Sequence, residues 1–262
     1  MIEYINETPL KEPLIFDTHA HYDDSRFDED RKELFETLHK NGVGGIITCG
    51  CDLASSKQAI KMAEDNPFVY AAVGIHPGNM ENPDELYEIE KLYSHKKCVA
   101  IGEIGLDYYW TDDNKPLQKE IFTKQLENSL KYKLPVIVHD REAHADTLEI
   151  LKEYKPSGVI HAFSGSPEMA EELLKLGLYI GIGGVITFKN AKKLPEVVKT
   201  LPDNRILLET DAPYLAPVPY RSKTNNSTMI YLTAEKIAEL RQTTTENILN
   251  LTFKNAKELF SV

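Results

Sequence analysis

The sequence predicts a single-domain α/β protein with a (β/α)8 TIM barrel fold, and three observations support this prediction. The chain has 262 residues, a length common for such barrels. Eight short apolar runs recur along it, with helical patterns between them. Most of these runs are apolar at both odd and even positions, as expected for parallel strands that are covered on both faces.

The eight predicted strands are aliphatic segments that give way to polar residues at their C-terminal ends. They start near residues 13, 44, 68, 98, 134, 158, 178 and 205, in the segments PLIFDTH, GGIITCG, FVYAAVGIH, CVAIGEIGL, LPVIVHD, GVIHAF, LYIGIGG and RILLETD. The chain shows no Ser/Gly-rich linker, low-complexity tract or compositional break. We therefore expect one domain over residues 1–262, with residues 1–13 as an extension before the first strand.

Helical segments between the strands carry recognisable start and stop signals. Residues 166–177 begin with Ser166 and Pro167, which are favoured at the N-cap and at the first helical position, and they end at Gly177. Comparable patterns occupy residues 28–42, 82–93 and 233–260, the last as a pair of helices.

Composition excludes several classes of protein. The net charge of −11 argues against a broad basic face for nucleic acid, although a nucleic-acid enzyme with local or metallic positive charge is compatible with it. Three cysteines do not form a disulfide framework, and Cys49 and Cys51 are interpreted as small apolar residues at a strand end. The sequence shows neither a signal peptide nor a membrane span, so we expect a cytoplasmic protein without membrane attachment or an obligate protein partner.

Residues that can bind metal gather at the C-terminal ends of the predicted strands. His19 and His21 follow the first apolar run, and side chains at positions i and i+2 of a strand point the same way. Barrel enzymes build their active sites on this face. The later strands carry His76, Glu103, His139, His161 and Asp211, whereas three further histidines, His39, His95 and His144, fall in helices or loops and are expected to be solvated.

Six of these residues form a candidate set of metal ligands. Carboxylates that meet at one barrel mouth would repel each other and lose solvation unless cations were present. Four imidazoles, two carboxylates and no thiolate suit Zn²⁺, Mn²⁺ or Fe²⁺, with Mg²⁺ possible if water and substrate oxygens complete its shell. The set exceeds the needs of one tetrahedral ion, so we expect two ions, roughly 3.5–4 Å apart, with Glu103 as the candidate bridge. The six ligands are His19, His21, Glu103, His139, His161 and Asp211.

The segments FDTHAH, GIHP, GEIGLDYY, PVIVHDREA, HAFSG and ETDAPYLAP closely resemble, in this order, motifs of the TatD-type metal-dependent deoxyribonucleases, a family within the amidohydrolase-like barrels. The resemblance covers nearly the whole chain. It implies exonucleolytic hydrolysis of phosphodiester bonds in DNA by a cytoplasmic enzyme. It also implies two divalent ions (Mg, Mn or Zn) and no organic cofactor.

The resemblance further implies a role for each candidate residue. Asp211 would accept a proton from the attacking water, and Glu103 would bridge the two ions. These two are therefore the expected catalytic residues. His76 would face the substrate phosphate. One ion would be held by His19, His21, Glu103 and Asp211, and Glu103 would bridge it to a second ion held by His139 and His161.

The loop after the eighth strand departs from the family pattern. The family sequence Arg-Gly-Lys-Arg-Asn-Glu-Pro is here RSKTNNS, residues 221–227, in which Arg221, Lys223 and Asn225 keep their places. Arg221 and Lys223 are candidate substrate-binding residues, because cations after barrel strands can contact phosphates. Arg141 is a further candidate of this kind. If the loop contacts substrate, its substitutions change that contact, whereas the metal ligands are unaffected.

Four more residues have two possible interpretations. Asp17 and Glu209 share strand parity with His19 and Asp211, so each could orient a metal ligand or be an ordinary buried carboxylate. The other two either line the barrel mouth or belong to a cluster of loop aromatics; they are Asp107 and Tyr108.

Two other functions are compatible with the composition. A metal-dependent hydrolase of an amide or ester carbonyl is the main alternative, but many such barrels place a carbamate-modified lysine on the fourth strand, where this chain has Glu103. A non-enzymatic metal-binding or nucleic-acid-binding protein is less favoured, because phosphate binding without chemistry normally relies on many cations.

Overall fold

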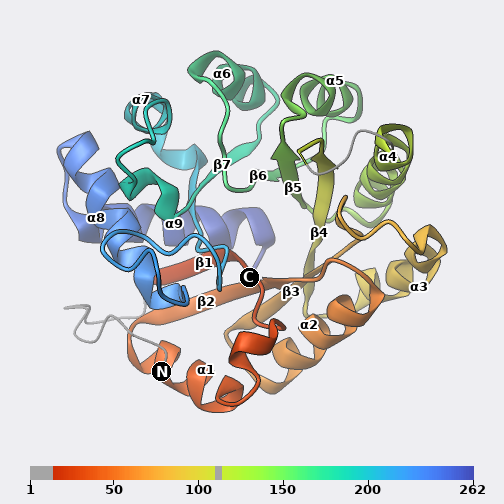
Figure 1. Ribbon diagram of the computed structural model, residues 1–262, viewed down its shortest axis with the longest axis horizontal. Helices are drawn as coiled ribbons and strands as arrows, with labels where there is room; N and C mark the ends of the chain where they lie inside the picture. Colours follow the sequence, from red (N-terminus) through yellow and green to blue (C-terminus); the bar gives the residue numbers. More distant parts are fainter. Residues whose placement is uncertain (1–13, 110–113) are drawn as a thin grey trace.

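The computed structural model describes residues 14–109 and 114–262, so the predicted extension at residues 1–13 lies outside the described residues. Eight strands form one parallel sheet in the order of the sequence, and helices surround them (Figure 1). This confirms the predicted (β/α)8 barrel. The strands are β1 Ile15–Ala20, β2 Val43–Cys49, β3 Val69–Val73, β4 Cys98–Asp107, β5 Val136–Arg141, β6 Gly158–Ile160, β7 Tyr179–Ile182 and β8 Ile206–Leu208.

The barrel is nearly closed where the end of β1 meets the segment after β8. Ala20 and Ala212 form a parallel bridge there. The backbone N–H of Asp211 donates to the His19 carbonyl at 2.9 Å, and that of His21 donates to the Ala212 carbonyl at 2.7 Å. The seam therefore holds three predicted metal ligands side by side.

The helices of the described residues pack against the outside of this sheet. Ser166 caps its helix by accepting a hydrogen bond from the Met169 N–H, and Gly177 adopts a positive φ of 84° after the helix, as predicted. The helices are α1 Arg31–Lys40, α2 Leu53–Asp65, α3 Leu86–Glu90, α4 Lys115–Tyr132, α5 His144–Tyr154, α6 Pro167–Lys175, α7 Leu194–Thr200, α8 Ile230–Arg241 and α9 Thr245–Phe260.

Residues 82–93 differ from the single helix that their pattern predicts. The segment divides into a 3₁₀ turn at Pro83–Glu85, the five-residue α3, and a second 3₁₀ turn at Lys91–Ser94. Asn82 makes no side-chain cap bond here. Uncapped N–H groups at a helix end are often satisfied by tighter turns, which accounts for the broken helix.

The barrel interior is packed with apolar side chains from the strands, including Phe16, Ile137 and Leu207. Helix α9 adds Leu259 and Phe260 to this cluster and thereby covers one end of the barrel. Because apolar residues fill that end, the polar residues at the C-terminal ends of the strands face the other end, where active sites of this architecture lie.

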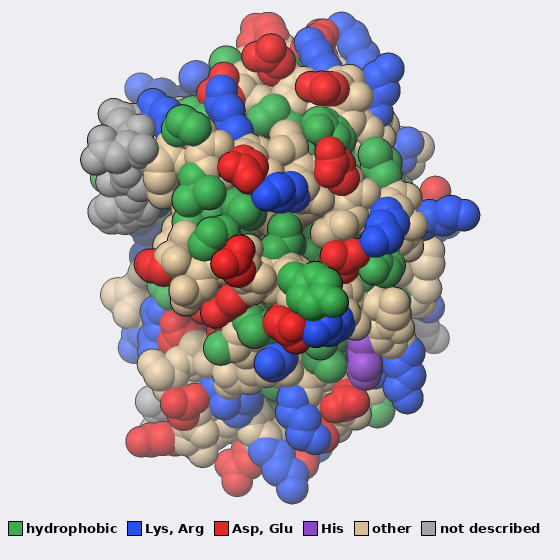
Figure 2. Space-filling view, turned by 90° about the vertical axis from the view of Figure 1, so that its right-hand side faces the viewer, with side chains coloured by type: hydrophobic (Ala, Val, Ile, Leu, Met, Phe, Trp, Pro, Cys, Tyr) green, Lys and Arg blue, Asp and Glu red, His purple; other side chains and the backbone are tan. Residues whose placement is uncertain are grey.

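The outer surface carries charges of both signs. Figure 2 shows one flank on which Lys and Arg alternate with Asp and Glu, without a broad patch of one sign. In the described part of the chain, each helix is too short or too polar to cross a membrane.

Candidate metal centre

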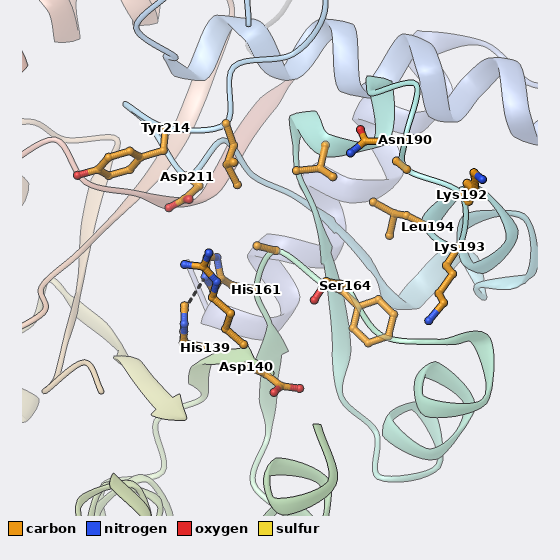
Figure 3. Close-up of a pocket in the computed structure, with 16 residues that line it drawn as sticks. His139, Asp140, His161, Ser164, Asn190, Lys192, Lys193, Leu194, Asp211 and Tyr214 are labelled. Carbon is orange, nitrogen blue, oxygen red and sulfur yellow. Dashed lines mark hydrogen bonds between the residues drawn. The ribbon is translucent and has the colours of Figure 1, made fainter. Parts of the chain in front are cut away.

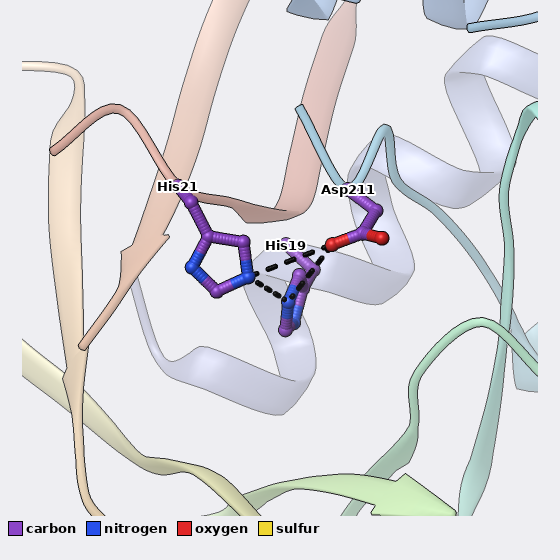
Figure 4. A group of neighbouring side chains, drawn as sticks. All are labelled: His19, His21 and Asp211. Carbon is purple, nitrogen blue, oxygen red and sulfur yellow. Dashed lines mark hydrogen bonds and ion pairs between the residues drawn. The ribbon is translucent and has the colours of Figure 1, made fainter. Parts of the chain in front are cut away.

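The first group of ligand atoms consists of four predicted residues at the barrel seam. The Nε2 atoms of His19 and His21 lie 3.1 Å apart. Both face Oε2 of Glu103, at 3.3 and 3.4 Å, respectively. They also face Oδ1 of Asp211, at 3.6 and 3.5 Å (Figure 4). Four donor atoms at such mutual distances have the spacing expected around one ion.

Asp211 reaches this position through an unusual backbone conformation. Its φ is +57°, in the left-handed region that Asp tolerates better than most residues. Its N–H bonds to His19 at the same time. The turn after β8 thus directs the carboxylate into the mouth rather than along the strand.

The second group of ligand atoms surrounds the other oxygen of Glu103. Oε1 lies 2.8 Å from Nδ1 of His139 and 3.0 Å from Nε2 of His161. These two nitrogens are 3.4 Å apart. Glu103 is 3% exposed, and each of its oxygens faces its own group of nitrogens. This is the arrangement expected of a bridging carboxylate.

Three of these four imidazoles have a carbonyl or carboxylate oxygen beside the outer nitrogen. His21 donates from Nδ1 to the Cys49 carbonyl at 3.1 Å, and His139 donates from Nε2 to Oδ2 of Asp107 at 3.1 Å. Oε1 of Glu209 lies 3.5 Å from Nδ1 of His161. A proton held on the outer nitrogen leaves the inner lone pair free for a metal.

His19 has an unusual outer neighbour. Its Nδ1 lies 3.5 Å from Sγ of Cys49, so a thiol occupies the position that a carbonyl or carboxylate takes behind the other three rings.

His76 lies at the same centre but is oriented in the opposite sense. Its Nε2 is 3.5 Å from Oε1 of Glu103, close enough to be counted with His139 as a possible ligand. However, its Nδ1 accepts a hydrogen bond from the Gly78 N–H at 2.9 Å. A neutral ring then carries its proton on Nε2, and burial lowers the pKa of His76 to about 3. His76 therefore presents an N–H, rather than a lone pair, to the mouth.

The two predicted orienting carboxylates behave differently. Glu209 faces His161 and accepts a hydrogen bond from the Ala162 N–H, as an orienting residue would. Asp17 does not contact the His19 ring, because β1 has a register irregularity between Asp17 and Ala20 that breaks the simple alternation. Of the two interpretations left open for Asp17, the structure agrees with the buried carboxylate.

Asp17 instead fastens the barrel seam from behind. It accepts hydrogen bonds from the Thr210 hydroxyl at 2.6 Å and from the Ser227 hydroxyl at 2.7 Å. Asn225 donates to the carbonyls of Thr210 and Tyr214. Asn225 and Ser227 are fully buried. The second half of the divergent 221–227 loop is therefore bonded into the core, and its substitutions act on packing rather than on substrate contact.

The other two uncertain residues, Asp107 and Tyr108, also differ. Asp107 reaches the centre through His139, whereas the Tyr108 hydroxyl donates to Asp146 on α5. The three remaining histidines lie outside the centre, but only the first of them is solvated as expected. His39 is exposed, and the other two are half-buried and pair with carboxylates elsewhere: His95 with Glu64, and His144 with Asp140.

The electrostatics of the centre favour charged groups of both signs. Burial by itself would raise the pKa of Glu103, but the surrounding histidines hold it well below its usual range. Burial by itself would lower the pKa of His21, but Cys51, Asp211 and Glu103 raise it well above 6.5. Burial would likewise lower the pKa of His161, but Glu103 and Glu209 raise it well above 6.5. Protons on these rings thus balance the carboxylates until cations replace them.

Metal uptake at neutral pH is therefore expected to release protons. An ion binds only a deprotonated ring nitrogen, and the pKa values of three of the ligand histidines, His21, His139 and His161, are raised. Apparent affinity should consequently weaken as the pH falls below these raised values. Calorimetric titration with Zn²⁺ in buffers of different ionisation enthalpy measures the release. His144→Ala, which removes a histidine with raised pKa outside the centre, should leave it unchanged; a binding heat independent of the buffer would contradict the expectation.

A cavity of about 700 Å³ opens beside the centre. Figure 3 shows His139, His161 and Asp211 on one side of it and Lys192 and Lys193 on the other. Arg141 and Ser164 also line it. The mouth therefore combines metal-binding groups with cations, although the whole chain is acidic.

Arg221 and Lys223, the predicted substrate-binding residues, are exposed and do not belong to the described lining of this cavity. The guanidinium of Arg221 stacks over Phe188 at 3.9 Å.

Sequence reasoning missed Lys192 and Lys193, whose signal was the pair of lysines in FKNAKK after the seventh strand. It interpreted Cys49 and Cys51 as small apolar residues, although their position at the end of β2 was an available signal that they reach the mouth.

Comparisons with known proteins agree with this centre. The family model described as "TatD related DNase" matches residues 16–261. The chain is similar to YabD of Bacillus subtilis (strain 168), named an uncharacterized metal-dependent hydrolase, with 42% identity over 95% of this chain and 100% of YabD. YcfH of Escherichia coli (strain K12), which has the same description, is 35% identical over 95% of this chain and 96% of YcfH.

A solved structure shows the same architecture. YjjV, a TatD homolog from Escherichia coli K12, superimposes with a TM-score of 0.90 at 32% identity and covers 95% of this chain and 99% of its own. Matches of this extent, together with the clustered ligands, establish the relationship. The chain belongs to the TatD-related DNase family and is a metal-dependent hydrolase with a TIM-barrel fold.

Proposed function

We propose that the chain is a phosphodiesterase that hydrolyses DNA from a strand end with two divalent ions. The observation that carries the proposal is the position of the Glu103 carboxylate between two groups of histidines. Each of its oxygens faces the nitrogen atoms of a different group, at 2.8 to 3.4 Å. DNA is the proposed substrate, in the cytoplasm and without an obligate protein partner.

The donor set fits two ions. His19, His21 and Asp211 would hold one and His139 and His161 the other, with Glu103 shared. Two such ions supply an activated water and neutralise charge on a phosphoryl group. Asp211 is suited to accept the proton of the attacking water, because its side chain is 18% exposed at the mouth. His76 would donate a hydrogen bond from its Nε2–H to a phosphate oxygen.

The cavity favours a phosphodiester over a carbonyl substrate. Lys192, Lys193 and Arg141 line it, and such cations recognise phosphate oxygens. An uncharged amide or ester would leave them unused. The position of a bridging lysine carbamate is occupied by Glu103 on β4. A volume of this size is typical of sites for small ligands, about 300–1,000 Å³, which supports binding of a strand end.

Aromatic side chains beside cations support single-stranded DNA in particular. Tyr214 is 47% exposed and lies under Arg26 at 4.4 Å; Tyr109 is 56% exposed and lies under Arg141 at 3.9 Å. Exposed rings that stack on bases, combined with cations that contact the backbone, are the usual means of binding unpaired strands.

Replacing either rim tyrosine is expected to weaken substrate binding without stopping the chemistry. Tyr109→Ala and Tyr214→Ala should each raise KM for a labelled single-stranded oligonucleotide about tenfold, since stacking on one base contributes roughly 1–3 kcal/mol, while kcat changes little. Tyr87→Ala is the matched control, because Tyr87 is also exposed beneath a cation, Lys91, but lies on α3. Equal KM values for all three variants would refute a role of the rim.

The proposed function is tested with end-labelled single-stranded DNA and Mg²⁺, Mn²⁺ or Zn²⁺. Release of mononucleotides from one end supports it. If the metal is bound but DNA stays intact, while a panel of ester and amide substrates is cleaved, the carbonyl hydrolase is the correct function.

A further inference from the structure

Two cysteines lie directly behind the first pair of histidines. Cys49 is the last residue of β2 and is fully buried. Cys51 follows two residues later and is half-buried at the edge of the mouth. Sγ of Cys51 lies 3.8 Å from Nδ1 of His21, the outer nitrogen of that ring. The two thiols thus occupy different depths of the same site.

The backbone holds Cys51 next to the ligands. Its carbonyl accepts a hydrogen bond from the His76 N–H at 2.9 Å, and the carbonyl of Gly50 accepts one from the Glu103 N–H at 3.0 Å. The Cys51 N–H donates to the Ser55 hydroxyl at 2.8 Å. A Cβ on Gly50 would lie 2.5 Å from the Cα of Ser56, so this close approach requires glycine. The loop is therefore fixed to β4 and to helix α2.

Donor atoms of three residues meet here. His21, Cys51 and Glu103 each contribute one atom, and the three atoms lie within 4.8 Å of one another. Two of the three are ligands of the centre described above. Among the described residues, Cys49 does not join any such group; its sulfur instead faces the outer nitrogen of His19. Of the two cysteines, Cys51 is thus the one placed among donor atoms that could share an ion.

A thiol at this position changes which metals the site prefers. Thiolates bind Zn²⁺, Fe²⁺ and Co²⁺ well and bind Mg²⁺ poorly, whereas carboxylates and water suit Mg²⁺ and Mn²⁺. Ion binding displaces the thiol proton, as it does for any cysteine ligand.

We propose that Cys51 is a thiolate ligand of the ion held by His21 and Glu103, and that it gives this centre a preference for thiophilic ions. The inference rests on the metal centre of the proposed function but is independent of the substrate. Cys51 thereby extends the predicted set of four imidazoles and two carboxylates with a sulfur donor.

Cobalt spectroscopy of the full-length protein tests the proposal without an activity assay. Co²⁺ bound to thiolate shows a charge-transfer band in the near ultraviolet, and Co²⁺ in any low-symmetry site shows d–d bands in the visible. The wild type should show both. Cys51→Ser and Cys51→Ala should lose the charge-transfer band and keep the d–d bands. The preference for Zn²⁺ over Mn²⁺, measured by competition, should fall by about tenfold or more, the order seen when a group near a metal site is removed.

Two matched variants identify the source of the band. Cys98→Ser removes a buried thiol at the start of β4, and Cys49→Ser removes the thiol behind His19; both should keep the charge-transfer band. Loss of the band with Cys49→Ser alone would overturn the proposal. Visible bands without a charge-transfer band in the wild type would overturn it while leaving the metal centre intact. No cobalt uptake at all would overturn both.

Discussion

Asp211→Asn is expected to lower kcat for single-stranded DNA by about three orders of magnitude. Asparagine has the same size, but it has no negative charge and does not accept a proton. The native carboxylate is well suited to this role. Burial by itself would raise its pKa, but the hydrogen bond from His21 and the charges of His161 and His19 lower it, so Asp211 is ionised at neutral pH.

The measurement pairs kcat with metal content by mass spectrometry. A full complement of metal with a collapsed kcat would assign Asp211 mainly to proton transfer, whereas loss of one ion would assign it mainly to binding. Asp65→Asn is the control, because Asp65 is an exposed aspartate that pairs with Lys61 on α2. A variant Asp211→Asn with wild-type kcat would refute the proposed mechanism.

Glu103→Gln is expected to remove at least one of the two ions and to lower kcat about 10⁴-fold. Glutamine has one side-chain oxygen in place of two. The NH₂ group that replaces the other oxygen donates hydrogen bonds and does not bind metal. The carboxylate has four histidine nitrogens within 3.4 Å. Because both donor groups depend on it, its loss should affect both ions.

Equilibrium dialysis against Mn²⁺ or Zn²⁺ measures this loss, and the rise of Tm on adding metal provides a second readout. Glu64→Gln is the matched control, since Glu64 also faces a histidine, His95, but on the surface. If Glu103→Gln retained two ions, the bridging role would be wrong, although a metal centre of another arrangement would still be possible.

The strand pattern was sufficient to predict both the fold and the six residues that meet at its mouth. Apolar runs alternating with helices specify parallel strands, and parallel strands place all their C-terminal ends at one mouth. His139 and Glu103 lie within their strands, so their convergence follows from topology alone. The divergent 221–227 loop does not affect this convergence, because none of the six predicted ligands lies in the loop.

The strand pattern did not predict contacts that depend on the direction of individual side chains. Parity left open whether Asp17 orients His19 or is an ordinary buried carboxylate, and only its contact with Ser227 supports the second. Lys192 and Lys193 lie in a loop, and no periodicity indicates where a loop points. The sequence also showed that His76 lies after a strand, but only its bond from Gly78 distinguishes a donor from a ligand.

The sequence by itself determined the barrel and the six residues that meet at its mouth, because hydrophobic periodicity fixes strand order and strand order fixes which ends coincide. The tertiary structure alone decided how those residues are used. Which oxygen of Glu103 faces which histidines, and that a sulfur of Cys51 reaches the same site, depend on contacts of a few ångströms between segments far apart in the chain. Such contacts are set by packing and hydrogen bonding of the whole fold, which local patterns do not encode.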